Sequence, residues 1–137
     1  MNEFLRRHPW LLFVVLVLVA SNQSAHKDAP SPTSEQGLRV MIIEDVTQRH
    51  ELPTSQIEQL TSESDDSVIA WLKANAVEWR ITDQAADMSL DSRGAQELFA
   101  RPREAVPWLV AGNGRRGVEG RLPTTKDETL AKLKGIK

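Results

Sequence analysis

Between residues 39 and 136 the sequence alternates strand-like runs with helix-like stretches, and this alternation constrains the fold more than any other feature. The first run, RVMII, is apolar and rich in β-branched residues, which is typical of a buried central strand. Later runs alternate apolar and polar residues or lead into the tight-turn pair Asn113-Gly114. Four strands are predicted, at residues 39–43, 77–82, 106–110 and 117–120.

Helices are expected between these strands, because capping residues precede stretches with apolar residues on one face. Pro53 suits a first helical turn, an aspartate at 65–66 is expected to cap a helix over 68–72, and Asp-Ser at 91–92 precedes the next helix. Residues 125–128 (TKDE) form a capping box. Strands and helices in this order predict an α/β domain, with a central mixed sheet of about four strands flanked by helices.

The first twenty-one residues differ in composition from the rest. Residues 10–20 are an unbroken apolar run that follows Arg6 and Arg7. A membrane-spanning helix needs about 20 apolar residues, and this run is shorter. The segment is therefore predicted to form a hydrophobic helix that is either a signal peptide or an uncleaved signal anchor. In either case the arginines stay in the cytoplasm and the rest is extracytoplasmic: secreted, periplasmic or held at the membrane through the N-terminal segment.

A polar stretch separates this segment from the α/β domain. Residues 22–37 contain Pro30 and Pro32 and show no periodicity, which predicts a flexible tether. The boundaries are therefore a signal peptide or anchor at 1–21, a tether at 22–37 and one folded domain at 38–137, within the length that a single domain needs.

Charge is divided unevenly along the domain, although the net charge of the whole chain is only -2 and gives no reason to expect a nucleic-acid partner. Residues 42–92 carry 11 acidic and 3 basic side chains, whereas residues 93–137 carry 10 basic and 5 acidic ones. Solvated faces of opposite charge would explain this division. Alternatively, a basic patch that includes Arg115 and Arg116 docks an acidic protein partner or another anionic surface.

The chain contains no cysteine. Disulfide bonds, thiolate nucleophiles and cysteine-ligated metal sites are therefore excluded.

The order of elements resembles the thioredoxin-like superfamily over residues 38–136. The most specific part is the run Val106-Pro107-Trp108, followed by Asn113-Gly114, a glycine-rich strand and an amphipathic helix. In that family a cis-proline opens this strand, and Pro107 occupies the matching position. The resemblance implies that backbone at Val106 and Pro107 pairs with an extended peptide by strand addition. Alternatively, Pro107 only shapes the turn into the strand. The tryptophans Trp71, Trp79 and Trp108 are expected to pack in the core or at its rim; as an alternative, Trp108 lines a binding groove beside Pro107.

The family's redox motif would lie at residues 46–50, where this sequence reads VTQRH. Thiol–disulfide exchange needs a thiolate, so that activity is excluded. The sequence therefore predicts an exported or membrane-tethered, non-redox thioredoxin-like domain with a binding or structural role.

Two other functions stay open. A loop site around Glu44, Asp45 and His50 would give an enzyme, because carboxylates and one imidazole form mixed oxygen–nitrogen sites; a solvated loop has the same composition. The second open function is that of a subunit of an envelope assembly, which would dock through Arg115 and Arg116. No cofactor or metal is expected. The glycine pattern at 112–117 fits a hairpin rather than a dinucleotide site, which would have to open a helix.

Overall fold

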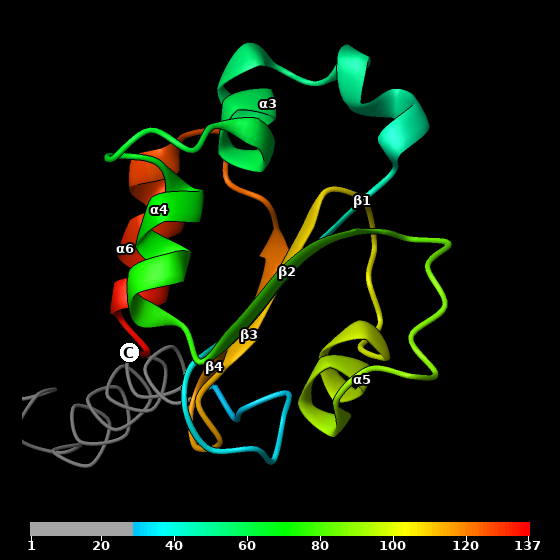
Figure 1. Cartoon of the computed structure of the whole chain (residues 1–137), viewed down its shortest axis with the longest axis vertical. Helices are drawn as coiled ribbons and strands as arrows, with labels where there is room; N and C mark the ends of the chain where they lie inside the picture. The colour runs from blue at the N-terminus through cyan, green and yellow to red at the C-terminus, as the bar shows by residue number, and fades with distance from the viewer. Residues whose placement is uncertain (1–28) are drawn as a thin grey trace, which may run out of the picture.

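The computed structural model describes residues 29–137, so the expected signal segment and its hydrophobic helix at residues 1–21 lie outside the described residues. The elements follow the predicted order (Figure 1). They are β1 (Arg39–Glu44), the 3-10 helix η1 (Val46–Glu51), α3 (Thr54–Thr61), α4 (Val68–Asn75), β2 (Glu78–Asp83), α5 (Arg93–Phe99), β3 (Trp108–Gly112), β4 (Gly117–Arg121) and α6 (Lys126–Lys134).

The strands form one mixed sheet in the order β2-β1-β3-β4. β1 pairs in parallel with β2, whereas β3 is antiparallel to both β1 and β4. The prediction of an α/β domain with a four-stranded mixed sheet flanked by helices is confirmed. The third strand begins at Trp108, so Val106 and Pro107 precede it rather than open it.

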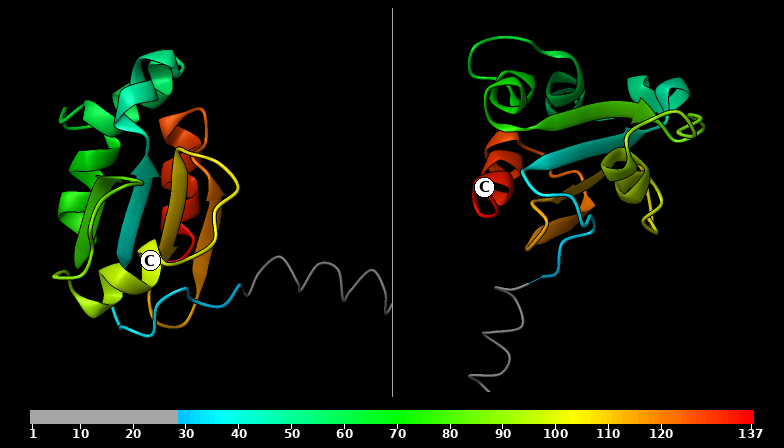
Figure 2. Two further views of the ribbon diagram at one scale, coloured as in Figure 1. Left: turned by 90° about the vertical axis from the view of Figure 1, so that its right-hand side faces the viewer. Right: turned by 60° about the horizontal axis from the view of Figure 1, so that its bottom comes forward.

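Alternation along β1 and β3 divides the core into two layers, because successive strand residues point to opposite faces. Val40 and Ile42 of β1 join Leu109 of β3 in one cluster with the apolar faces of α3, α4 and α6. Met41 and Ile43 belong to the other cluster, which includes Ala95 and Leu98 of α5. The two views of Figure 2 show the sheet with helices on either side. β1 and β3 are therefore buried on both faces.

Side-chain caps explain where three of the helices begin. The hydroxyls of Ser92 and Thr125 accept hydrogen bonds from the backbone N–H groups of Ala95 and Glu128, as the sequence predicts. The cap of α4 is Ser67, whose hydroxyl accepts from the N–H of Ala70, so the predicted aspartate cap at 65–66 is wrong. Ser67 and Ala70 are three positions apart in the sequence, which is the spacing that a capping side chain spans.

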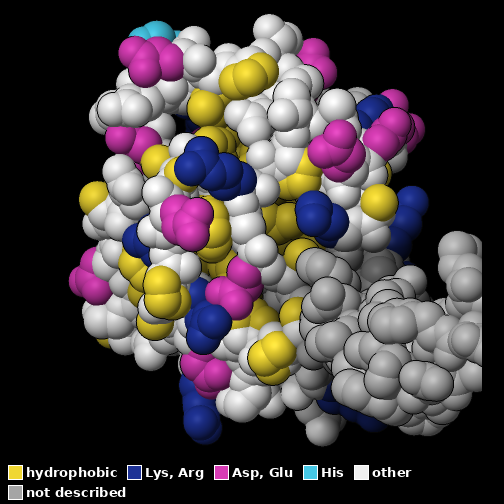
Figure 3. All heavy atoms as spheres, turned by 180° about the vertical axis from the view of Figure 1, so that it is seen from behind, with side chains coloured by type: hydrophobic (Ala, Val, Ile, Leu, Met, Phe, Trp, Pro, Cys, Tyr) yellow, Lys and Arg dark blue, Asp and Glu magenta, His cyan; other side chains and the backbone are white. Residues whose placement is uncertain are grey.

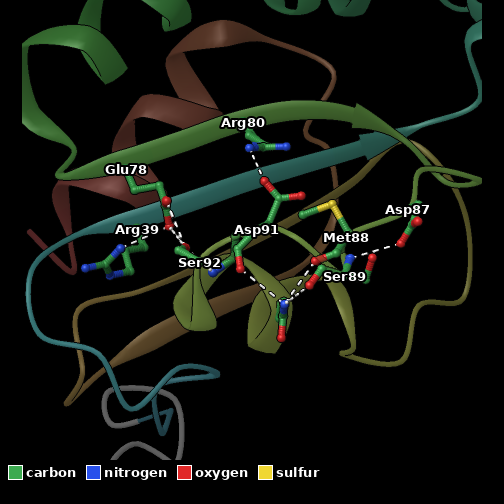
Figure 4. A network of polar contacts seen from close by, with 10 residues as sticks. Arg39, Glu78, Arg80, Asp87, Met88, Ser89, Asp91 and Ser92 are labelled. Carbon is green, nitrogen blue, oxygen red and sulfur yellow. Dashed lines mark hydrogen bonds and ion pairs between the residues drawn. The ribbon is translucent and has the colours of Figure 1, made fainter.

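The loop from β2 to α5 is held mainly by one amide. The Nε2 of Gln96 donates to the carbonyl oxygens of Met88, Ser89 and Asp91 at 3.0, 3.1 and 3.1 Å. Asp91 also forms an ion pair with Arg80 of β2 (Figure 4). These contacts fix the loop beside the sheet.

Residues 29–37 pack on the domain, so the expected flexible tether over 22–37 does not extend through them. The N–H of Gly117 donates to the carbonyl of Ala29 at 3.1 Å, and the Ser34 hydroxyl donates to the Glu97 carboxylate at 3.0 Å. A Cβ at Gly117 would lie 2.4 Å from Cδ of Pro32. The segment therefore crosses the β3–β4 hairpin at its turn.

That turn has four residues, 113–116, and Gly114 has a φ of 90°. Figure 1 shows the turn at the same end of the molecule as the C-terminus and the start of the described chain, with η1 and α3 at the opposite end. Among residues 29–137 no helix combines the length and apolar character that crossing a membrane requires.

Candidate functional site

A groove of about 480 Å³ opens beside the start of β3. It is lined by the end of η1, the first turn of α3, the segment before β3, the segment after β4 and one face of α6. The lining residues are Leu52, Gln56, Ala105, Val106, Pro107, Arg121, Leu122, Pro123, Thr124, Glu128 and Lys132.

Two hydrogen bonds build the wall of the groove. The backbone N–H of Leu122 donates to the carbonyl of Pro107 at 3.0 Å, which extends the pairing of β3 and β4 by one step. The Nε2 of Gln56 donates to the carbonyl of Leu122 at 2.8 Å and ties α3 to the same segment. The carbonyl of Pro107 and the N–H of Leu122 are therefore already hydrogen-bonded to each other.

Val106 is the first residue beyond this pairing, and its peptide bond to Pro107 is cis. Within residues 29–137, neither the N–H nor the carbonyl of Val106 has a hydrogen-bond partner, and the residue is half-buried. A backbone donor and acceptor left unpaired next to a groove are the groups that an added strand uses.

The groove combines an apolar surface with charged groups. The half-buried residues Leu52, Ala105 and Val106 supply apolar surface, while Leu122 and Pro123 are buried. Charged side chains are exposed around the groove: Arg121, Glu128 and Lys132. Figure 3 shows the rear face of the molecule, where hydrophobic side chains lie among acidic and basic ones. An extended peptide with both apolar and charged side chains fits this composition.

Trp108 packs in the core, as expected, and does not line the groove, which corrects the alternative that placed it there beside Pro107. Only 9% of the residue is exposed, and it packs in the cluster with Met41, Met88 and Leu98 on the α5 side of the sheet. Its Nε1 is buried and has no hydrogen-bond partner among the described residues. The cause is the alternation of β3, which turns Trp108 and Val110 to the same face.

Glu44 ends β1 as a buried carboxylate that is only 1% exposed. Arg49 binds it through two contacts, Nε to Oε2 at 3.2 Å and a second from Nη2 to Oε1. This hydrogen-bonded pairing raises the pKa of the Arg49 guanidinium above its ordinary value. Because the carboxylate is committed to Arg49, Glu44 does not point into a loop site.

The structure does not bring Glu44, Asp45 and His50 together. Asp45 caps η1, since its carboxylate accepts from the backbone N–H of Thr47 at 3.0 Å. His50 points outward with 76% of its side chain exposed, and Glu51 is its nearest acidic neighbour at 3.9 Å. Within residues 29–137 no three acidic or imidazole side chains are grouped so that they would hold a metal ion.

Arg115 and Arg116 lie in the β3–β4 turn, at the far end of β3 from Pro107. They are exposed and belong to a separate hollow of about 540 Å³ with Asn113 and Lys137. The candidate residues therefore fall into two places, the groove at Val106 and Pro107 and the basic turn at the opposite end.

Three residues that matter here were missed in the sequence. Arg49 lies in a loop-like stretch, and nothing in its spacing identifies Glu44 as its partner. Gln56 reaches a segment 66 residues away, so its contact with Leu122 leaves no local pattern. Leu122 carried a weak signal, because an apolar residue directly after an alternating strand often continues the pairing.

Comparisons of this chain with protein-family models, with curated proteins and with solved structures found no match.

Proposed function

We propose that this chain is a non-redox, thioredoxin-like binding domain, attached to a membrane or exported through its N-terminal segment, that holds an extended peptide in the groove beside Val106. The observation that carries the proposal is the unpaired backbone of Val106 at a groove of about 480 Å³. Added strands bind through such main-chain groups, and side-chain pockets then give specificity.

The arrangement of the elements supports the thioredoxin-like part of the proposal. The order of strands and helices along the chain and the cis bond before Pro107 agree with what the resemblance implies. The stretch that would hold the redox motif is η1, where Arg49 neutralises Glu44 and no thiol is present. These features favour a binding function that does not involve thiol chemistry.

Peptide binding is favoured over an enzyme at Glu44, Asp45 and His50 by the direction of those side chains. The first is paired with Arg49, the second caps η1 and the third points to solvent. General acid–base catalysis needs groups within hydrogen-bond reach of one substrate, and no such convergence supports it here.

A groove-filling substitution tests the proposal. Random linear peptides displayed on phage are selected on the full chain in detergent micelles, and the selected peptides are synthesised for titration. Ala105→Trp places an indole in the groove, so peptide affinity is expected to fall by at least about tenfold, or 1.4 kcal/mol. Ala131→Trp is the matched control, because Ala131 is exposed on α6 and does not line the groove.

The control is expected to bind within about twofold of the unsubstituted chain. Selection that yields no peptide above background would contradict the proposal. Peptides that bind Ala105→Trp as tightly as the parent chain would place the binding surface elsewhere.

A further inference from the structure

The end of the domain opposite the groove carries a compact set of basic side chains. Arg115 and Arg116 lie in the β3–β4 turn, and Asn113 Nδ2 donates to the carbonyl of Ile136 at 2.6 Å, which brings the last residues beside that turn. Together with Lys137 the two arginines line one hollow of about 540 Å³. We call Arg115, Arg116 and Lys137 the basic end.

The two arginines are held in place through their backbone while their guanidinium groups stay exposed. Asn113 Oδ1 accepts from the backbone N–H groups of Arg115 and Arg116 at 2.8 and 2.7 Å. Within residues 29–137 neither guanidinium forms an ion pair, whereas Arg101 is paired with Glu119. Neither guanidinium is therefore paired with an acidic group of the described residues.

The chain also enters the described domain at this end. Ala29 accepts a hydrogen bond from Gly117, and Pro30 forms a β-bridge with Arg116 itself. Eight residues, 21–28, separate Ala29 from the end of the apolar run at Ala20. The nine Cα–Cα steps from Ala20 to Ala29 span at most about 32 Å when fully extended, so the point where the chain joins the basic end stays within that distance of the apolar run.

We infer that Arg115 and Arg116 contact anionic lipid headgroups of the membrane that receives the N-terminal apolar run, and that this contact turns the groove away from the membrane. The inference rests on the membrane attachment included in the proposed function. Peptide binding in the groove requires neither this orientation nor this class of lipid. The charge of the basic end and the short connection to the apolar run both point to the same surface.

The size of the effect follows from the number of exposed charges. One lysine or arginine near an anionic surface favours the contact by roughly fivefold. Two arginines therefore favour the docked orientation by about 25-fold, without counting Lys137. Salt weakens such contacts, because the Debye length is about 8 Å at physiological ionic strength.

Energy transfer to labelled lipids measures this orientation, and the absence of cysteine makes any introduced cysteine a unique labelling site. Gln36→Cys labels the basic end, since the Cα of Gln36 lies near Gly114. Gln48→Cys labels η1 at the opposite end. Each full-length chain is reconstituted into nanodiscs of phosphatidylcholine alone, or of phosphatidylcholine with phosphatidylglycerol, that contain a headgroup-labelled acceptor.

Discs with phosphatidylglycerol are expected to give stronger transfer from the label at position 36 than from the label at position 48. Arg115→Gln with Arg116→Gln, or high salt, should reduce that difference to the smaller one that the short connection alone gives in phosphatidylcholine discs. Arg101→Gln with Lys126→Gln is the matched control, because it lowers the net charge equally at surface pairs away from the turn. It should leave the difference unchanged.

Equal transfer from both positions in anionic discs would overturn the inference, as would a difference that neutralisation of the two arginines does not reduce. An acidic protein partner at the basic end, in place of lipid, would give that first result. A full chain that fails to enter phosphatidylcholine discs would contradict membrane attachment in the proposed function. In that case flotation of the chain with anionic vesicles still tests the arginines, and loss of flotation on their neutralisation would support the lipid contact. Flotation that does not depend on the arginines would overturn it.

Discussion

Arg49→Leu should destabilise the domain strongly, because it leaves the Glu44 carboxylate buried without a partner. Removal of one member of a buried ion pair costs about 3–5 kcal/mol. Glu44 has only 2% of its side chain exposed, but 34% of the Arg49 side chain reaches solvent, and water would replace part of the lost contact. We therefore expect a loss of about 2–3 kcal/mol in the free energy of unfolding.

Urea unfolding of the full chain, followed by tryptophan fluorescence, measures this loss. The control is Lys73→Leu, which removes a lysine from an exposed pair with Glu63 and should cost less than about 1 kcal/mol. The double variant Glu44→Leu with Arg49→Leu should recover most of the loss, since a buried pair is often replaced by apolar side chains at little cost.

The interpretation of Glu44 as a structural group fails if Arg49→Leu costs no more than Lys73→Leu. It also fails if the double variant is less stable than Arg49→Leu, because the carboxylate would then have a stabilising role that does not depend on Arg49.

Three further predictions concern the packing of residues 29–37 and the loop before α5. The Ser34 backbone N–H holds the pKa of the Glu97 carboxyl below its ordinary value. The hydrogen bond therefore stabilises the folded domain fully above the unfolded pKa of about 4.3, and this stabilisation is lost as the pH falls through the folded pKa. In an NMR titration with acid, the chemical shift of the Ser34 amide should change as the Glu97 carboxyl is protonated. The same amide should not show this change in the Glu97→Gln variant. Gln96→Leu removes three hydrogen bonds to the loop and should increase amide exchange in residues 84–91 while the strands stay protected. Gly117→Ala forces a methyl group against Pro32 and should lower the free energy of unfolding by about 1–3 kcal/mol in the same urea assay; an unchanged value would contradict the packing of this segment.

Strand positions were predictable because their signals are local. The apolar run of β1 and the alternation in β2 placed both strands within one residue of their observed bounds. Ser92 and Thr125 were also readable, because a capping side chain acts on a backbone group three residues away.

The features that were missed depend on contacts between distant segments. Nothing periodic marks residues 29–37, and their packing depends on the close approach that Gly112 and Gly117 permit. Core packing of Trp108 was expected, but the alternative place in the groove could be excluded only once strand alternation was seen to turn its side chain to the opposite face. The pairing of Glu44 with Arg49 depends on the path of η1, which local sequence does not encode.

The candidate groove was partly predictable. Val106 and Pro107 were identified through the resemblance, and both line it. The contributions of Gln56 and Leu122 were not identified, because α3 and the end of β4 meet only in the folded chain.

Hydrogen exchange at the Val106 amide tests the central claim most directly. A peptide selected on the full chain is added at saturation, and exchange is compared with and without it by NMR. We expect the Val106 N–H, which has no partner within residues 29–137, to become protected by at least about tenfold as it pairs with the peptide backbone. Exchange at Val106 that is unchanged while the peptide is bound would contradict the account.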